Sequence, residues 1–288
     1  MDILQEFTKY IQQIGYSKGS QYQIPNCIKE FLEVTSKSAC TELSRSIKSI
    51  TQQDILGFYE YLQTRPLKRR TGALSEAMIN HYVFSLKTFF GWLEQTQQIK
   101  YNPISNLKFK RPQGNPREPL SQKEINQLFE NAITSKETAI LHLFYSCGLR
   151  RTEAENLNTS DIHFSKNLLY VREGKGAKRR VIPMNEKVKK ELENYYNNDR
   201  TKINEEAFIL NRTNERMRGD SYNRALKEII KRAEIEKEIT LHHLRHSIAT
   251  HLLENGLSIE FVRDFLGHSH LEATQIYAKV RAKQLKNL

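Results

Sequence analysis

The stretch ITLHHLRHSIATHLLENG, residues 239–256, sets the plan of this sequence. Thr240 is a residue type that caps the start of a helix, and Gly256 is the type that ends one in the left-handed conformation. A helix is therefore predicted between these two residues. Its first turns carry His242 and Arg245, whose side chains are suited to proton transfer and to holding a phosphate. The helix is expected to serve a functional site as well as a core.

The sequence around this stretch predicts a mixed domain with a β-hairpin. SIEFVRDFLGH (258–268) repeats the helix design, with Ser258 as the cap and Gly267 as the stop. KETAILHLFYSCG (136–148) is typical of a buried helix, and NLLYVREGKGAKRRVIPM (167–184) predicts two short strands joined by a turn that contains glycine. Amphipathic helices are expected at 186–196 and 222–233.

The N-terminal part predicts a small helical bundle. SEAMINHYVFSLKTFFGWLEQT (75–96) is its longest helical pattern, and no alternating strand pattern occurs there. Four prolines and a glycine crowd the sequence between 103 and 119, which disfavours both helix and sheet. Ser121 and Glu124 then have the spacing of a capping box. These signals predict a helical domain at 1–110, a linker at 111–118 and a second domain at 119–288.

The composition indicates a soluble protein that binds a polyanion. The net charge is +12 and the pI about 9.5, which favours a nucleic acid or an anionic surface as the partner. The three cysteines form no CxxC pair, as is usual in a reducing cytoplasm. The sequence has neither a secretory signal pattern nor about 18 consecutive apolar residues, so we expect a cytoplasmic protein with no membrane partner.

Four segments of the second domain supply the groups that phosphodiester transfer needs. The attacked phosphate gathers negative charge, which arginine can hold because its planar fork matches phosphate geometry and stays protonated. The leaving oxygen needs a proton donor, and the attack needs a nucleophile held in line. The segments are CGLRRTEAENL (147–157), EGKGAKRRVIP (173–183), HHLRHSIATHLL (242–253) and LGHSHLEATQIYAKV (266–280).

These segments, in this order, resemble the catalytic motifs of the tyrosine recombinase (phage integrase) family, especially its small Xer-type members. The resemblance implies a mainly α fold with a small β-hairpin or sheet in the catalytic domain. It also implies a two-domain, C-shaped clamp on DNA, with a SAM-like core-binding domain at 1–110 and the catalytic domain at 119–288. The catalytic residues that it implies are Arg150, Lys175, His242, Arg245, His268 and Tyr277.

The resemblance also implies roles. Tyr277 would attack the scissile phosphate, leaving a 3′-phosphotyrosyl link and a free 5′ hydroxyl. Arg150 and Arg245 would hold the phosphate, and His268 would donate a hydrogen bond to it. Lys175 would protonate the leaving oxygen, and His242 would assist proton transfer. No cofactor and no metal are expected, because the phosphotyrosyl bond conserves the energy needed for rejoining.

The partners implied are double-stranded DNA with specific core sites and further copies of the chain. Family members act as homotetramers on two paired sites and exchange strands through a Holliday junction, so a monomer in solution and a tetramer on DNA are expected. The resemblance implies a prokaryotic, nucleoid-associated protein, and no accessory protein can be named. Dimer or cointegrate resolution, inversion, and mobile-element integration or excision (transposition) all fit. For phosphate contacts outside the catalytic domain, the sequence favours Lys87, Lys108, Lys110 and Arg111.

Several alternatives stay open at this stage. Lys178 lies three residues after Lys175 and could reach the same phosphate. His242 and His246 have the spacing of a zinc pair, although Arg245 lies between them and would oppose a cation. His246 and His251 are expected to pack within the helix core instead. The rival functions are a type IB topoisomerase, a catalytically idle DNA-binding accessory protein and a metallohydrolase.

Overall fold

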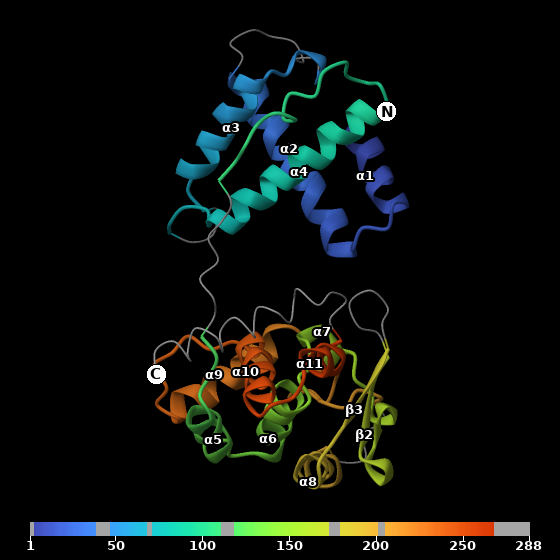
Figure 1. The fold of residues 1–288 in the computed structure, drawn as a ribbon, viewed down its shortest axis with the longest axis vertical. Helices are drawn as coiled ribbons and strands as arrows, with labels where there is room; N and C mark the ends of the chain where they lie inside the picture. Colours follow the sequence, from blue (N-terminus) through green and yellow to red (C-terminus); the bar gives the residue numbers. More distant parts are fainter. Residues whose placement is uncertain are drawn as a thin grey trace. The chain divides into compact units, whose positions relative to one another are not determined.

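The computed structural model describes residues 3–38, 47–67, 71–110, 118–172, 179–200 and 205–267. The chain divides into two compact units, Met1–Asn115 and Pro116–Leu288 (Figure 1). Each unit has its own hydrophobic core and is described by itself.

The first unit is helical throughout its named elements. It contains α1 (Ile3–Gln13), α2 (Lys18–Ser38), a short 3₁₀ turn at Ile47–Ser49, α3 (Gln52–Thr64) and α4 (Glu76–Gln95). Helix α4 packs on α2 and α3, while α2 also packs on α1. The apolar face predicted for the longest helix is buried, as seen at Ile79, Leu86 and Phe90. The bundle predicted for this part of the chain is confirmed by these helices.

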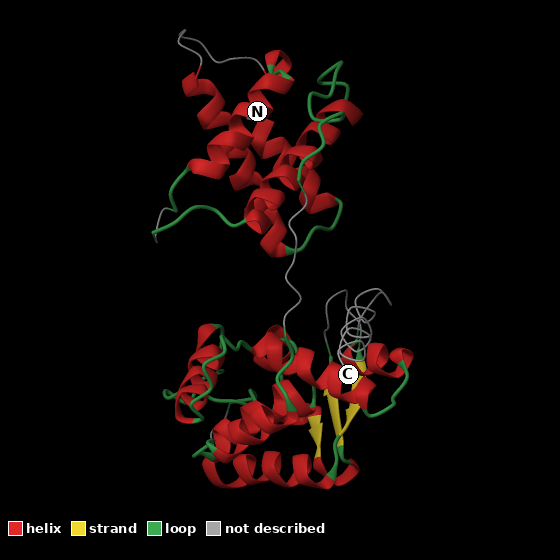
Figure 2. Cartoon of the chain, turned by 60° about the vertical axis from the view of Figure 1, so that its left-hand side comes forward, coloured by secondary structure: helices red, strands yellow, loops and turns green. Residues whose placement is uncertain are grey.

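The second unit combines helices with one small sheet (Figure 2). Its helices are α5 (Gln122–Glu130), α6 (Ser135–Leu141), α7 (Arg151–Glu155), α8 (Glu186–Asn194), α9 (Asp220–Arg232), α10 (Leu241–Glu254) and α11 (Ile259–Leu266). Helix α6 continues as a π-helical turn at His142–Ser146, which packs on α10. The predicted capping box is present, because Ser121 and Glu124 each bond the other's backbone N–H at the start of α5.

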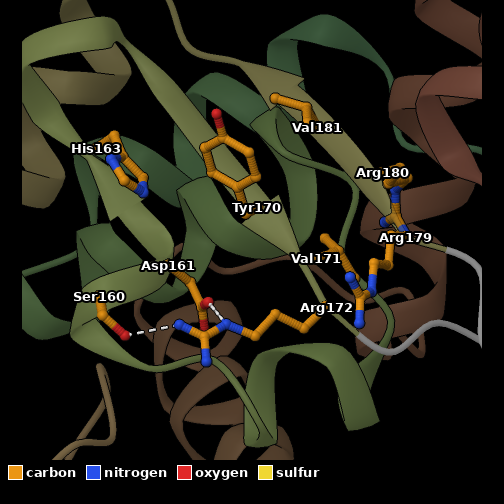
Figure 3. A pocket seen from close by; sticks show the side chains of 9 residues that line it. All are labelled: Ser160, Asp161, His163, Tyr170, Val171, Arg172, Arg179, Arg180 and Val181. Atoms are coloured by element: carbon orange, nitrogen blue, oxygen red, sulfur yellow. Dashed lines mark hydrogen bonds and ion pairs between the residues drawn. The ribbon is translucent and has the colours of Figure 1, made fainter.

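The sheet has three antiparallel strands, β1 (Ile162–His163), β2 (Leu168–Val171) and β3 (Arg180–Pro183), in that order. Strands β2 and β3 are the predicted hairpin, paired with Leu169 opposite Ile182. The two-residue strand β1 was not predicted, because it is too short to show an alternating pattern. Leu169 and Ile182 face the core, whereas Tyr170 and Val181 lie on the outer face, where Figure 3 shows the Tyr170 ring between His163 and Val181.

The two helices that carry motif residues begin and end as predicted. Thr240 caps α10, and Ser258 caps α11 by accepting a hydrogen bond from the backbone N–H of Phe261. Helix α11 ends at Gly267, whose φ of 64° lies in the left-handed region. The mainly α fold with a small sheet is thus confirmed. Among the described helices, none combines the length and apolar character needed to cross a membrane.

Candidate functional site

Three of the six predicted catalytic residues belong to the described part of the chain: Arg150, His242 and Arg245. Lys175, His268 and Tyr277 lie outside the described residues. The site is therefore built here from the two arginines, the histidine and their surroundings.

Arg150 occupies the N-cap position of α7, in extended conformation. Its backbone N–H donates to Oε2 of Glu153 at 2.7 Å, and its Nη1 donates to Oε1 of the same carboxylate at 2.7 Å. Its Nη2 donates to the carbonyl of Gly267 at 2.9 Å. The side chain remains 19% exposed, so the guanidinium group is fixed by the protein while part of it still faces solvent.

Arg245 reaches the same place from α10. Its Nη1 donates to the carbonyl of Gly148, and its Nη2 donates to the carbonyl of Leu266. Nη1 also lies 3.8 Å from Oε2 of Glu153. Segments nearly one hundred residues apart in sequence therefore bring two guanidinium groups to one carboxylate.

Glu153 is the centre of this arrangement. Its side chain is buried. Each of its two carboxylate oxygens accepts a hydrogen bond of 2.8 Å from a third arginine, Arg180 of β3. Burial by itself would raise the pKa of the Glu153 carboxyl, but the hydrogen bonds and charge of Arg180 outweigh it. With further help from the backbone N–H of Arg150 and the charge of Arg245, the pKa falls to about 2. The carboxylate is therefore ionised at neutral pH, as a buried charge must be when it is paired.

The three arginines also occupy the end of α11. The last carbonyls of a helix have no partner within the helix and carry its partial negative charge. Here the carbonyls of Phe265, Leu266 and Gly267 accept hydrogen bonds from Arg180, Arg245 and Arg150, respectively. The residue after Gly267 is the predicted His268, so this cluster fixes the point at which the chain enters the last motif.

The backbone at Gly148, two residues before Arg150, has a conformation and surroundings that favour glycine. Its φ of +58° is a conformation that other residues rarely adopt. A Cβ atom there would lie 2.9 Å from Cδ2 of Leu266 and 3.3 Å from the ring of Phe265. Glycine therefore suits a turn that passes this close to α11, where its carbonyl accepts from Arg245.

The histidines of α10 divide into two groups. His242 is exposed in the first turn, just beyond the Thr240 cap, on the helix that holds Arg245. His246 and His251 are buried, and Nδ1 of His251 lies 2.9 Å from the hydroxyl of Tyr145. The expectation that these two histidines pack in the core is confirmed. No group of three metal-ligating side chains occurs in the ranges that the structure describes.

Sequence reasoning missed Glu153 and Arg180. A signal for Glu153 was available, because it stands three residues after Arg150, where a helix's third residue often bonds back to the cap. Arg180 offered no such signal, because one arginine in the basic run KRR looks like its neighbours. Three guanidinium groups around one carboxylate leave an excess of positive charge, which suits a phosphate that gains negative charge during reaction.

The lysines predicted to contact DNA lie in the first unit. Lys108 is exposed, and Nζ of Lys87 lies 5.9 Å from the centre of the Phe109 ring. Lys110 pairs with Glu76 at 2.8 Å, an exposed ion pair of the kind that contributes little stability. Arg111 lies outside the described residues. The hydrogen bond to Glu76 raises the pKa of Lys110, so this side chain carries its charge at neutral pH.

Comparisons with known proteins agree with this architecture. The sequence model described as the phage integrase family matches residues 118–284. A tyrosine recombinase of Thermosipho africanus is 32% identical over 284 residues, covering 96% of this chain and 95% of that protein. Tyrosine recombinase XerA of Pyrococcus furiosus is 34% identical over 292 residues, covering 99% of this chain and 92% of that protein.

Solved structures share the fold. The crystal structure of XerA recombinase aligns with a TM-score of 0.54 at 26% identity, over 99% of this chain and 98% of that one. A λ integrase dimer bound to a COC′ core site aligns with a TM-score of 0.74 at 18% identity, over 96% of this chain and 93% of that one. The second likeness concerns the fold alone.

Proposed function

The chain belongs to the phage integrase family of tyrosine recombinases, and from this membership we propose that it cuts and rejoins duplex DNA at defined core sites through a covalent bond to Tyr277. The observation that carries the proposal is the convergence of Arg150 and Arg245 on one buried carboxylate at the end of α11. Fixed guanidinium groups at this place can stabilise a phosphate as it gains charge, without moving during the reaction.

Strand cleavage is then a transfer of one ester bond. The Oη atom of Tyr277 bonds to the phosphorus, and the bond from phosphorus to the 5′ oxygen breaks. Lys175 gives a proton to that oxygen, while His242 assists removal of the tyrosine proton. Arg150, Arg245 and His268 hold the non-bridging oxygens. A 5′ hydroxyl from another strand reverses these steps, so the bond energy is conserved and no nucleotide cofactor is consumed.

The first unit supplies phosphate contacts that fix the protein on its site. The side chains of Lys87 and Lys108 are both exposed, so their ammonium groups can reach a DNA backbone in solvent. Lys110 would exchange its contact with Glu76 for a phosphate. Contacts of this kind position the protein and do not read sequence.

The assembly that we propose is a tetramer on two paired sites, with strand exchange through a Holliday junction. The chain would work in the cytoplasm, at the nucleoid of a prokaryotic cell. The structure of λ integrase similar to this chain is a dimer on core-site DNA.

The decisive experiment captures covalent adducts. The protein is incubated with sheared genomic DNA of its host, denatured in detergent, and the DNA that remains attached is sequenced. We expect enrichment of a short inverted repeat, with the adduct mapped to Tyr277. Tyr277→Phe should abolish the adduct, whereas Tyr196→Phe, at an exposed tyrosine in the π-helical turn Tyr195–Asp199 that follows α8, should not. Adducts that persist in Tyr277→Phe would overturn the proposal.

A control on supercoiled plasmid without the site separates recombination from relaxation. A site-specific recombinase should leave this plasmid supercoiled under the same conditions. Efficient relaxation with no strand exchange between paired sites would instead indicate a type IB topoisomerase.

A further inference from the structure

Arg180 is held by protein acceptors through all three nitrogens of its guanidinium group. Its Nε donates to the carbonyl of Phe265 at 3.0 Å, and its two terminal nitrogens donate to the two oxygens of Glu153 at 2.8 Å each. The side chain is only 8% exposed. Each nitrogen of the guanidinium group therefore donates one hydrogen bond to the protein.

The position of Arg180 in the chain shows which elements these contacts hold together. It is the first residue of β3, where the chain returns from the turn that carries Lys175 in the sequence. Figure 3 shows Arg180 at the opposite edge of the pocket from His163, while the side chain of Arg172 extends toward Asp161. One side chain thus joins the base of the hairpin to the start of α7, through Glu153, and to the end of α11.

We propose that Arg180 is a positioning residue of the strand-cleavage reaction, which acts by orienting the Glu153 carboxylate and the end of α11 so that Arg150 and Arg245 face the scissile phosphate. This inference rests on the proposed function. In this proposal Arg180 acts through Glu153 and the end of α11 and does not contact the phosphate, since each of its three guanidinium nitrogens already donates to one of these two places.

The physical reason lies in the carboxylate torsion. The last torsion of a glutamate side chain is broad, so a lone partner would not fix the plane of its two oxygens. A guanidinium fork holds that plane with two parallel bonds. Glu153 can then accept from both the backbone and Nη1 of Arg150. Without the fork, the carboxylate could rotate, and the guanidinium group of Arg150 that it already holds would shift with it, away from the phosphate.

Lysine cannot replace this arginine. An ammonium group is a point donor and cannot form two parallel bonds while also reaching the Phe265 carbonyl. Arg180→Lys should therefore behave more like Arg180→Gln than like the parent protein, even though it keeps the positive charge.

The test measures single-turnover cleavage of a nicked duplex that carries the site recovered by adduct capture. Misplacement of reacting groups by about 1 Å lowers rates by about 100-fold, so we expect a loss of this order in the rate constant for Arg180→Gln. The dissociation constant for the same DNA should change by less than about threefold, since no phosphate contact is removed. In a Glu153→Gln background, Arg180→Gln should lower the cleavage rate constant by less than about a further threefold, because both changes disrupt the same contact between Arg180 and Glu153.

Arg172→Gln is the matched control. Arg172 directly follows β2 and pairs with a buried carboxylate, that of Asp161, and it donates a hydrogen bond to Ser160 rather than to Glu153 or the end of α11. It should leave the cleavage rate constant within about threefold of the parent value. An equal loss in Arg172→Gln, or full additivity of Arg180→Gln with Glu153→Gln, would overturn the inference. If the parent protein itself forms no Tyr277 adduct, the proposed function fails first, and this inference fails with it.

Discussion

Replacing Glu153 by glutamine should destabilise the second unit more than any other single carboxylate change near the site. The glutamine has the same shape but no charge, so Arg150, Arg180 and Arg245 would lose their shared anion. A buried cation left without its partner is costly, typically 3–5 kcal/mol, because its desolvation is no longer compensated. The change therefore tests whether this carboxylate holds the site together.

The structure gives an independent magnitude. The pKa of Glu153 falls from its ordinary value of 4.5 to about 2, and each pKa unit corresponds to about 1.4 kcal/mol, so the ionised form is favoured by roughly 3 kcal/mol. A loss of about 3 kcal/mol corresponds to a fall in Tm on the order of 10 °C for a domain of this size. The two routes to the magnitude agree.

The stability that the Glu153 carboxylate contributes should change with pH in a defined direction. A carboxyl group whose pKa is lowered by folding contributes its full stability above its ordinary pKa and loses it as the pH falls toward the folded value. The difference in Tm between the parent protein and Glu153→Gln should therefore be constant from about pH 6 to pH 8. It should narrow as the pH falls from about 5 toward about 3.

Thermal unfolding followed by circular dichroism measures both effects. Glu155→Gln is the control, because Glu155 lies on the same helix and pairs with the half-exposed Arg151 at 3.3 Å, while a glutamine oxygen can still accept the hydrogen bond from the backbone N–H of Gly219. Glu155→Gln should lower the free energy of unfolding by less than about 1 kcal/mol. Equal Tm values for the two variants, or a Glu153→Gln difference that does not narrow in acid, would refute the electrostatic account.

Three further predictions concern a turn, a buried histidine and a phosphate contact. Gly148→Ala should lower Tm by several degrees more than Gly256→Ala. Both glycines have positive φ, but only at Gly148 would the new Cβ atom meet another side chain within 4 Å. Equal losses of Tm would mean that the close approach to α11 is unimportant. Burial, reinforced by a nearby lysine, lowers the pKa of His142 to about 4, so stability should rise with pH between about 4 and 6.5, and His142→Phe should flatten that part of a pH–Tm profile. Lys108→Ala should reduce the salt slope of DNA binding by about 0.9, measured by fluorescence anisotropy at several salt concentrations, whereas Lys9→Ala on α1 should leave the slope unchanged.

Local signals in the sequence predicted most of the elements. The caps at Thr240 and Ser258, the stop at Gly267 and the box formed by Ser121 and Glu124 all depend on a few neighbouring residues, and each has the predicted role. The strand β1 escaped prediction because two residues cannot display a period. Its pairing exists only because β2 lies alongside.

The motifs predicted to be catalytic were recognisable because their residue types and order resemble a family, not because the sequence reveals distances. Nothing in the spacing of Arg150 and Arg245 says that both guanidinium groups reach one carboxylate. Nor does it say that three helix-end carbonyls accept from three arginines. These contacts join segments separated by as many as 117 residues.

The sequence by itself determined the helical bundle, the hairpin, the helix ends and the types of reactive side chain, because each follows from interactions between residues a few positions apart. Only the tertiary structure decided that Glu153 and Arg180 belong with them. Burial and charge pairing depend on which distant segments pack together, and an arginine or glutamate looks the same in sequence whether it faces water or the centre of a site.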